Sequence, residues 1–165
     1  MRQTYRAVAS LVALGVLVQA AAVAFGWFQA ISDIDNGMVF DQSYEGNAGH
    51  MLHGIVGMYV IPALGLILLI VSFFAARTVP SARKWAAIVF VLILLQVTLA
   101  FVAFGAPIVG ALHGINALLV LGTAVRASML ARTAGTATPA APSAAGGIPA
   151  QRSASTTGTG ADVPA

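Results

Sequence analysis

Residues 85–104 read WAAIVFVLILLQVTLAFVAF, twenty positions without a charged side chain. An α-helix rises about 1.5 Å per residue, so about 20 apolar residues cross the roughly 30 Å hydrocarbon core of a bilayer. The apolar residues are continuous rather than alternating with polar ones, which excludes a transmembrane β-strand. This stretch therefore predicts a membrane-spanning helix.

Three more apolar runs have the same character, and they cover about residues 7–31, 49–76 and 107–125. The first is longer than the roughly 7–15-residue core of a signal peptide, which favours an uncleaved helix. The second is long enough to tilt or kink, and Pro62 lies inside it. The segment Gly105-Ala106-Pro107 separates the third run from the fourth. We therefore expect an all-α fold, a four-helix transmembrane bundle formed by residues 1–132.

The composition agrees with a lipid environment. The 165 residues are 59% hydrophobic and 8% charged, whereas a soluble domain carries about 25% charged residues. There is no cysteine, which excludes disulfides, thiolate metal sites, iron–sulfur clusters and Cys-attached haem. The formal charge of +3 comes from basic residues at helix ends, so we expect the bilayer and no nucleic acid as partner.

The distribution of charge predicts the direction of the helices. In a four-span arrangement all eight basic residues fall on one side, namely Arg2, Arg6, Arg77, Arg83, Lys84, Arg126, Arg132 and Arg152. The loop on the other side carries only acids: Asp33, Asp35, Asp41 and Glu45. The positive-inside rule then places both termini in the cytoplasm and the acidic loop outside.

Residues 133–165 are mostly Ala, Gly, Thr, Ser and Pro. Such a segment buries too little apolar surface to offset the entropy of ordering, so we expect a disordered cytoplasmic tail.

The candidates for chemistry are three histidines, His50, His53 and His113, in the outer parts of the second and fourth spans. Histidine is costly inside a membrane and often marks a site there. Two neutral imidazoles on facing helices of a bundle can hold a haem iron between them. The alternative is a set of hydrogen-bonded structural histidines without any ligand.

Glycines near these histidines would leave room for a flat ring. Gly54 and Gly57 follow His50 and His53 by four residues, which places each pair on one helix face. Gly110 and Gly114 stand on either side of His113, but their four-residue spacing is also typical of helix packing.

The depth of each histidine in the membrane indicates which of His50 and His53 could pair with His113. Counted from the cytoplasmic ends, His53 is closer than His50 to the depth of His113. Gln19, Gln96 and Asn116 would form a polar layer near the midplane, either as hydrogen bonds between helices or as support beneath a cofactor. Asn116 follows His113 by three residues and is the best supporting candidate.

No other motif indicates catalysis. The sequence contains no phosphate loop and no nucleophile in a tight-turn motif. The acidic residues of the outer loop fit no calcium-loop spacing, so we expect a solvated loop.

Two segments carry a resemblance, 47–57 (NAGHMLHGIVG) and 107–118 (PIVGALHGINAL). Together they resemble a family of small uncharacterised four-helix bacterial membrane proteins. The layout of residues 5–130 is also similar to one half of haem A synthase, in which histidines of the second and fourth helices bind haem.

By position, the resemblance implies His50, through its spacing to Gly54, and His113 as ligands of the haem iron, with His53 as the alternate. Asn47 stands where the synthase pattern has Glu, and Met51 where it has Arg. The resemblance therefore implies haem b binding or electron transfer rather than haem A synthesis, with a homodimer restoring two halves.

Two functions remain open from sequence. The first is a b-type haem protein of the bacterial inner membrane that exchanges electrons with a redox partner. Its haem would be surrounded by Gly54, Gly110, Gly114 and Asn116. The second is a cofactor-free structural or accessory subunit that acts through helix packing.

Overall fold

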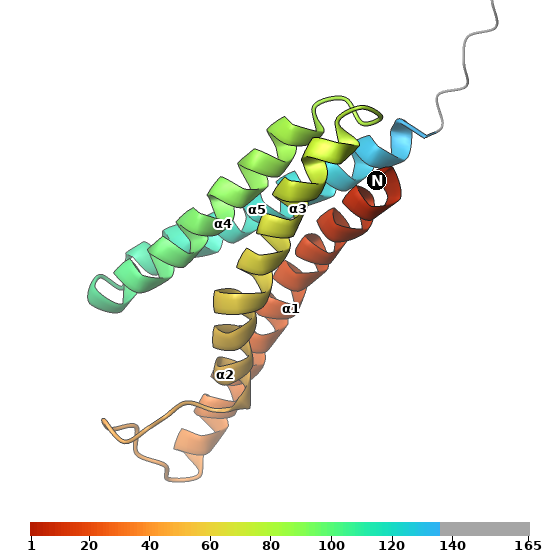
Figure 1. Ribbon diagram of the computed structural model, residues 1–165. Coiled ribbons are helices and arrows are strands. Elements are labelled where there is room, and N and C mark those ends of the chain that lie inside the picture. The colour runs from red at the N-terminus through yellow and green to blue at the C-terminus, as the bar shows by residue number, and fades with distance from the viewer. Residues whose placement is uncertain (136–165) are drawn as a thin grey trace, which may run out of the picture.

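A computed structural model describes residues 1–135, and every regular element in that part of the chain is helical (Figure 1). The elements in chain order are α1 (Arg2–Asp35), α2 (Ala48–Ile55), the π-helix η1 (Val56–Val60), α3 (Ile61–Ala75), α4 (Ala82–Gly105) and α5 (Val109–Thr133). α2, η1 and α3 form one continuous span. The described chain thus has four helices that are long and apolar enough to cross a membrane.

Two of the observed helices extend several residues beyond the ends of the predicted apolar runs. α1 continues from the predicted end at residue 31 to Asp35, and α5 continues from residue 125 to Thr133. A hydrophobic run marks only the part of a helix suited to hydrocarbon, whereas the backbone hydrogen bonds continue through polar residues at the ends. Of the predicted tail, residues 136–165 lie outside the described residues.

The four helices run alternately up and down, and the two ends of the bundle differ (Figure 1). The termini end holds the N-terminus, the α3–α4 turn and the last turns of α5. The loop end holds the 36–47 loop and the short α4–α5 turn. The helices lie close together at the termini end and diverge toward the loop end, where α1 stays with α2 and α4 stays with α5.

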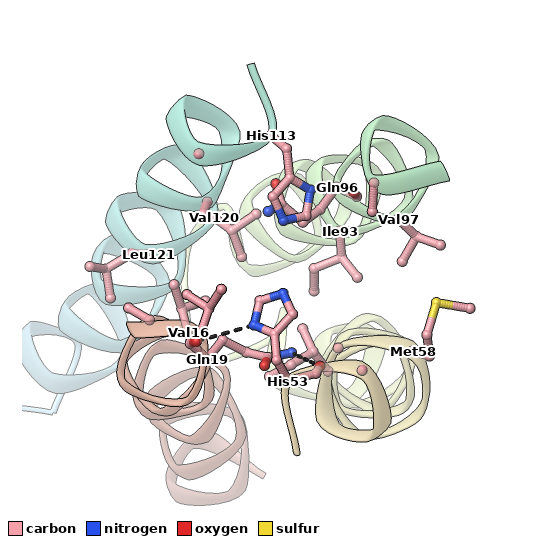
Figure 2. A pocket seen from close by; sticks show the side chains of 18 of the residues that line it. Val16, Gln19, His53, Met58, Ile93, Gln96, Val97, His113, Val120 and Leu121 are labelled. Carbon is pink, nitrogen blue, oxygen red and sulfur yellow. Dashed lines mark hydrogen bonds between the residues drawn. The ribbon is translucent and has the colours of Figure 1, made fainter. Parts of the chain in front are cut away.

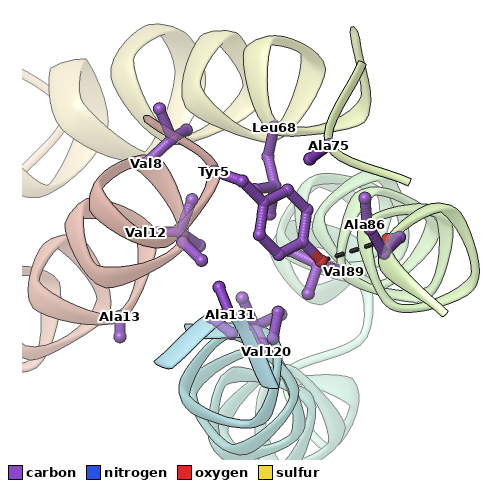
Figure 3. Close-up of a cluster of buried hydrophobic side chains, with 14 of the residues drawn as sticks. Tyr5, Val8, Val12, Ala13, Leu68, Ala75, Ala86, Val89, Val120 and Ala131 are labelled. Carbon is purple, nitrogen blue, oxygen red and sulfur yellow. Dashed lines mark hydrogen bonds between the residues drawn. The ribbon is translucent and has the colours of Figure 1, made fainter. Parts of the chain in front are cut away.

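The core lies at the termini end (Figure 3). Tyr5 is fully buried there, and its hydroxyl donates a 3.0 Å hydrogen bond to the carbonyl of Ala82. Seven of the buried residues in this core are alanines that are at most 2% exposed, namely Ala9, Ala75, Ala82, Ala86, Ala124, Ala127 and Ala131. Lipid gives helices no hydrophobic drive to associate, so close approach through small residues stabilises this end.

At the loop end the α1–α2 pair is packed closely enough to require glycine. A Cβ atom built on Gly49 would lie 2.6 Å from the Cα of Gly26, so glycine is required at this crossing. Asn47 caps α2: its Oδ1 accepts hydrogen bonds from the backbone N–H groups of Gly49 and His50. Its Nδ2 donates a 2.7 Å bond to the carbonyl of Gly26, which fixes α2 on α1.

The second span, for which a tilt or kink was expected, contains a π-helix just before Pro62. Pro62 has no N–H to donate, so the carbonyl of Met58 loses its partner in an α-helix. The chain adopts a π-helix at Val56–Val60, in which the N–H of Ile61 donates to the carbonyl of Val56, five residues earlier. The π-helix therefore separates the part of the span that packs on α1 near the loop end from α3, which packs on both α1 and α4.

Candidate functional site

A cavity of about 670 Å³ lies between the diverging hairpins, on the loop-end side of the core (Figure 2). All four spans contribute to its walls. Only four of its lining residues are polar, His53 and His113 together with Gln19 and Gln96. The remainder are glycines and apolar residues, so among residues 1–135 the two imidazoles are the only titratable groups that line this space.

His53 is held by a residue of α1. Its Nδ1 lies 3.1 Å from the carbonyl oxygen of Gln19. A carbonyl can only accept, so Nδ1 carries the proton and donates. The side chain of Gln19 returns a 3.0 Å hydrogen bond from Nε2 to the carbonyl of His53. This reciprocal pair fixes the imidazole and leaves the lone pair on Nε2.

His113 is held in the same way by a residue of α4. Its Nδ1 donates to the carbonyl oxygen of Gln96 at 3.0 Å. The Gln96 side chain is anchored in turn by Asn116, whose Nδ2 donates to Gln96 Oε1 at 2.7 Å and to the carbonyl of Leu92 at 2.9 Å. Asn116 is 3% exposed. It thus lies behind the cavity wall and supports the histidine through Gln96 rather than by touching the cavity.

The two rings face each other across the cavity. Their centroids are 6.3 Å apart and their planes are inclined at 60°. In Figure 2 the Nε2 edge of each ring points toward the other ring. A metal–imidazole bond of about 2.0 Å on each side, plus roughly 1 Å from each nitrogen to its ring centre, gives about 6 Å between centroids. The observed separation matches one metal ion between two imidazoles.

The two halves of the site repeat one pattern. Leu-His-Gly-Ile occurs at 52–55 and again at 112–115. In each hairpin the preceding helix carries a glutamine, Gln19 or Gln96, and an Ala-Phe-Gly that begins five or seven residues later, at 24–26 and 103–105. In both hairpins the histidine donates to the carbonyl of that glutamine. The sequence interpretation overlooked this repeat, which was the signal for pairing His53 with His113 and for the role of the glutamines.

The structure brings His53, and not His50, opposite His113. The ring of His50 lies against Trp27 at 5.5 Å in an edge-to-face arrangement and covers Gly26. It does not line the cavity. The tight crossing of Gly26 and Gly49 sets the rotation of α2, and this rotation points His50 into the α1–α2 contact. The interpretation that favoured His50 was based on its four-residue spacing to Gly54, and this spacing carries no information about how α2 packs on α1.

The glycines proposed to flank a ring divide into two groups. No atom lies within 4 Å of a Cβ built on Gly54 or Gly114, and both line the cavity. Gly57 lies under the amide of Gln19. Gly110 faces Ala103 at an ordinary packing distance and is not part of the lining. Open space beside each histidine is therefore supplied by the glycine that directly follows it.

The 36–47 loop shows local hydrogen bonds rather than a metal centre. Both the backbone N–H and the hydroxyl of Ser43 donate to Asp41 Oδ1, at 2.8 and 2.6 Å. The bond from the Ser43 hydroxyl is the main cause that lowers the pKa of Asp41. Within residues 1–135 no group of three or more His, Cys, Asp or Glu side chains is arranged to hold a metal ion.

Comparison of the chain with protein-family models, with curated proteins and with solved structures finds no match.

Proposed function

We propose that this chain is a multi-pass membrane protein that binds one b-type haem between His53 of α2 and His113 of α5. The observation that carries the proposal is the 6.3 Å separation of two imidazoles whose Nδ1 atoms are both engaged by backbone carbonyls. Two imidazoles fixed with Nε2 free toward one point are suited to axial ligation of iron. His50 has no place in this arrangement.

The surroundings fit a flat, apolar group better than a bare metal ion. The cavity volume falls within the about 300–1,000 Å³ of typical cofactor sites. A single ion needs no such volume, and two imidazoles without a carboxylate give it few ligands. The bare flanks at Gly54 and Gly114 leave room for a ring plane that passes between the histidines.

A haem bound here would supply one-electron chemistry. His53 and His113 would hold the iron, and the described part of the chain offers no further charged or nucleophilic group in the cavity for work on a substrate. Electron transfer or haem handling is therefore the function that the chain's residues support. With both termini in the cytoplasm, as the charge distribution predicts, the site lies in the outer half of a bacterial inner membrane.

The test is an absorption spectrum of the detergent-purified protein, oxidised and then reduced with dithionite, from cells supplied with a haem precursor. We expect a Soret band and sharp reduced α and β bands in the wild type. His53→Ala and His113→Ala should each remove these bands while circular dichroism stays helical. His50→Ala is the matched control and should keep them, because His50 packs outside the cavity.

Three outcomes would contradict the proposal. A folded but colourless wild type would favour the cofactor-free accessory subunit. Copper or zinc in metal analysis without a Soret band would favour a bare metal site. Loss of the bands in His50→Ala with their retention in His53→Ala would move the axial ligand to His50.

A further inference from the structure

The cavity is open toward the side as well as toward the loop end. α2 packs against α1 and η1, and no extensive contact joins it to α4. The resulting opening, here the α2–α4 flank, is bordered by Gly54 and Met58 on one side and by Ala100 and Phe101 on the other. Met58 is 39% exposed and Phe101 59% exposed. On the opposite side of the bundle α1 and α5 pack against each other.

The medium outside this flank is hydrocarbon. Both helices belong to spans with the length and hydropathy of membrane helices. None of the four residues that border the flank is charged or polar. The apolar body of a flat ring can therefore pass between them without displacing a charged or polar side chain.

The route from water is less favourable for the same ligand. The connection over the loop end carries Asp33, Asp35, Asp41 and Glu45 without any basic residue. A haem bears two carboxylates at one edge of its ring, and these acids repel a dianion that approaches from the aqueous side. Charge and opening therefore both point away from the water-facing end.

From these observations we infer that haem enters and leaves the cavity sideways from the bilayer, through the α2–α4 flank. The inference rests on the proposed function, because it concerns the same cavity and ligand. It adds the source of the ligand: the protein takes up haem that is already dissolved in lipid. The chain would accordingly exchange haem with other membrane components without a soluble carrier.

The first test fills the flank. Gly54→Leu adds a side chain where no protein atom lies within 4 Å, so the bundle has no reason to shift. Gly122→Leu is the matched control, since Gly122 has the same free space around it but does not line the cavity. Haem is added to vesicles that contain the apoprotein, and growth of the Soret band is followed. We expect Gly54→Leu to slow loading about ten-fold, as a barrier raised by about 1.4 kcal/mol would, and Gly122→Leu to load at the wild-type rate.

The second test uses only the wild type and remains decisive if Gly54→Leu binds no haem at all. Haem is allowed to enter the vesicles, and an excess of a water-soluble haem scavenger is then added. Sideways entry predicts that the bis-imidazole band continues to grow, because the scavenger cannot reach haem in the bilayer. Loading that stops on addition of scavenger, or Gly54→Leu loading at the wild-type rate, would overturn sideways entry alone. A wild type that never develops the band would overturn haem binding itself.

Discussion

At the termini end four helices close around Tyr5 and a set of alanines, whereas at the loop end the same helices diverge around His53 and His113 (Figures 2 and 3). The difference lies in the residues that face the axis. α4 has buried residues at Ala82, Ala86, Val89 and Ile93, and none of the twelve positions after Ile93 is buried. Small apolar side chains let helices approach in lipid, and where they are absent the helices separate.

The polar atoms follow the same division. Among the described residues, the buried side-chain atoms without a hydrogen-bond partner are Gln19 Oε1 and Asn116 Oδ1. Gln19 contacts His53 directly, and Asn116 supports His113 through Gln96. A buried acceptor without a partner costs about 1–3 kcal/mol. Stability is thus concentrated at one end, while the other end maintains a costly arrangement of polar groups around a space.

The largest effect is expected inside the α1–α2 hairpin, where the two helices touch through Gly26 and Gly49. Gly49→Leu would force a side chain into the backbone of Gly26, and the two helices must move apart. We expect a loss of about 3 kcal/mol or more in the free energy of unfolding, measured by titration with SDS. A loss below about 1 kcal/mol would show that this contact is as loose as the space between the hairpins.

Haem bound as proposed should reduce the contrast between the two ends, because the proposed ligands His53 and His113 belong to different hairpins. Binding to the folded state alone stabilises it by about 2.7 kcal/mol when free haem is at 100 times its Kd. The same SDS titration with and without haem measures this gain. His53→Ala should abolish it, and an equal gain in that variant would mean that haem binds elsewhere.

The same substitution at two positions of α4 compares the ends directly. Ala86 is fully buried in the core, whereas Ala100 lines the cavity. Ala86→Leu should destabilise the apoprotein by about 2 kcal/mol through overpacking, and Ala100→Leu by less than about 0.5 kcal/mol. Equal losses at the two positions would contradict the division between packed and open ends.

A smaller effect is expected from the hydrogen bond that Tyr5 makes between helices in the core at the termini end. Tyr5→Phe removes the donor to the carbonyl of Ala82 and keeps the ring. Hydrogen bonds between membrane helices average about 0.6 kcal/mol and reach about 1.7 kcal/mol, so we expect a loss of about 1 kcal/mol. Tyr5→Leu is the informative companion, since it also removes the ring and should cost more. A Tyr5→Phe protein as stable as the wild type would show that packing alone holds this end.

The smallest effect concerns the exposed loop. The hydrogen bonds from Ser43 hold the pKa of Asp41 below its usual value. A carboxyl whose pKa is lowered in the folded state contributes stability above its unfolded pKa, and this contribution disappears as the pH falls through the folded pKa. In a carbon NMR titration of the carboxyl group, Ser43→Ala should raise the pKa of Asp41 toward its usual value of about 3.9. An unchanged titration curve would show that the Asp41–Ser43 turn does not persist in solution.

Much of the fold follows from the sequence, because hydropathy reports directly on the solvent of each segment. The predicted runs correspond to four helices, and the break at 105–107 is a turn. The helix ends were underestimated, since hydropathy does not report backbone hydrogen bonds outside hydrocarbon. The expected kink near Pro62 takes the form of a π-helix, whose existence depends on how one carbonyl finds a donor.

The site was predictable only in part. Residue type marked the three histidines, but His50 and His53 are one turn apart on the same helix. Which one faces α5 is decided by the contact of Gly26 with Gly49, and that contact joins residues distant in sequence. The repeated Leu-His-Gly-Ile places His53 and His113 at equivalent positions of the two hairpins, and it was the sequence signal for pairing these two histidines.

The π-helix at Val56–Val60 makes the orientation of His53 depend on the number of residues between His53 and Pro62. An α-helix advances about 100° per residue, and the π-helix places one additional residue in a turn. The wider turn takes up this additional residue, so His53 keeps the orientation relative to α3 that an α-helix one residue shorter would give it. If the same residues were wound as an unbroken α-helix, His53 would be rotated by about 100° relative to α3, and the opposed imidazoles would be lost without any change in the hydropathy profile. The number of residues between this histidine and this proline is thus a more specific marker of the site than the hydropathy of the span.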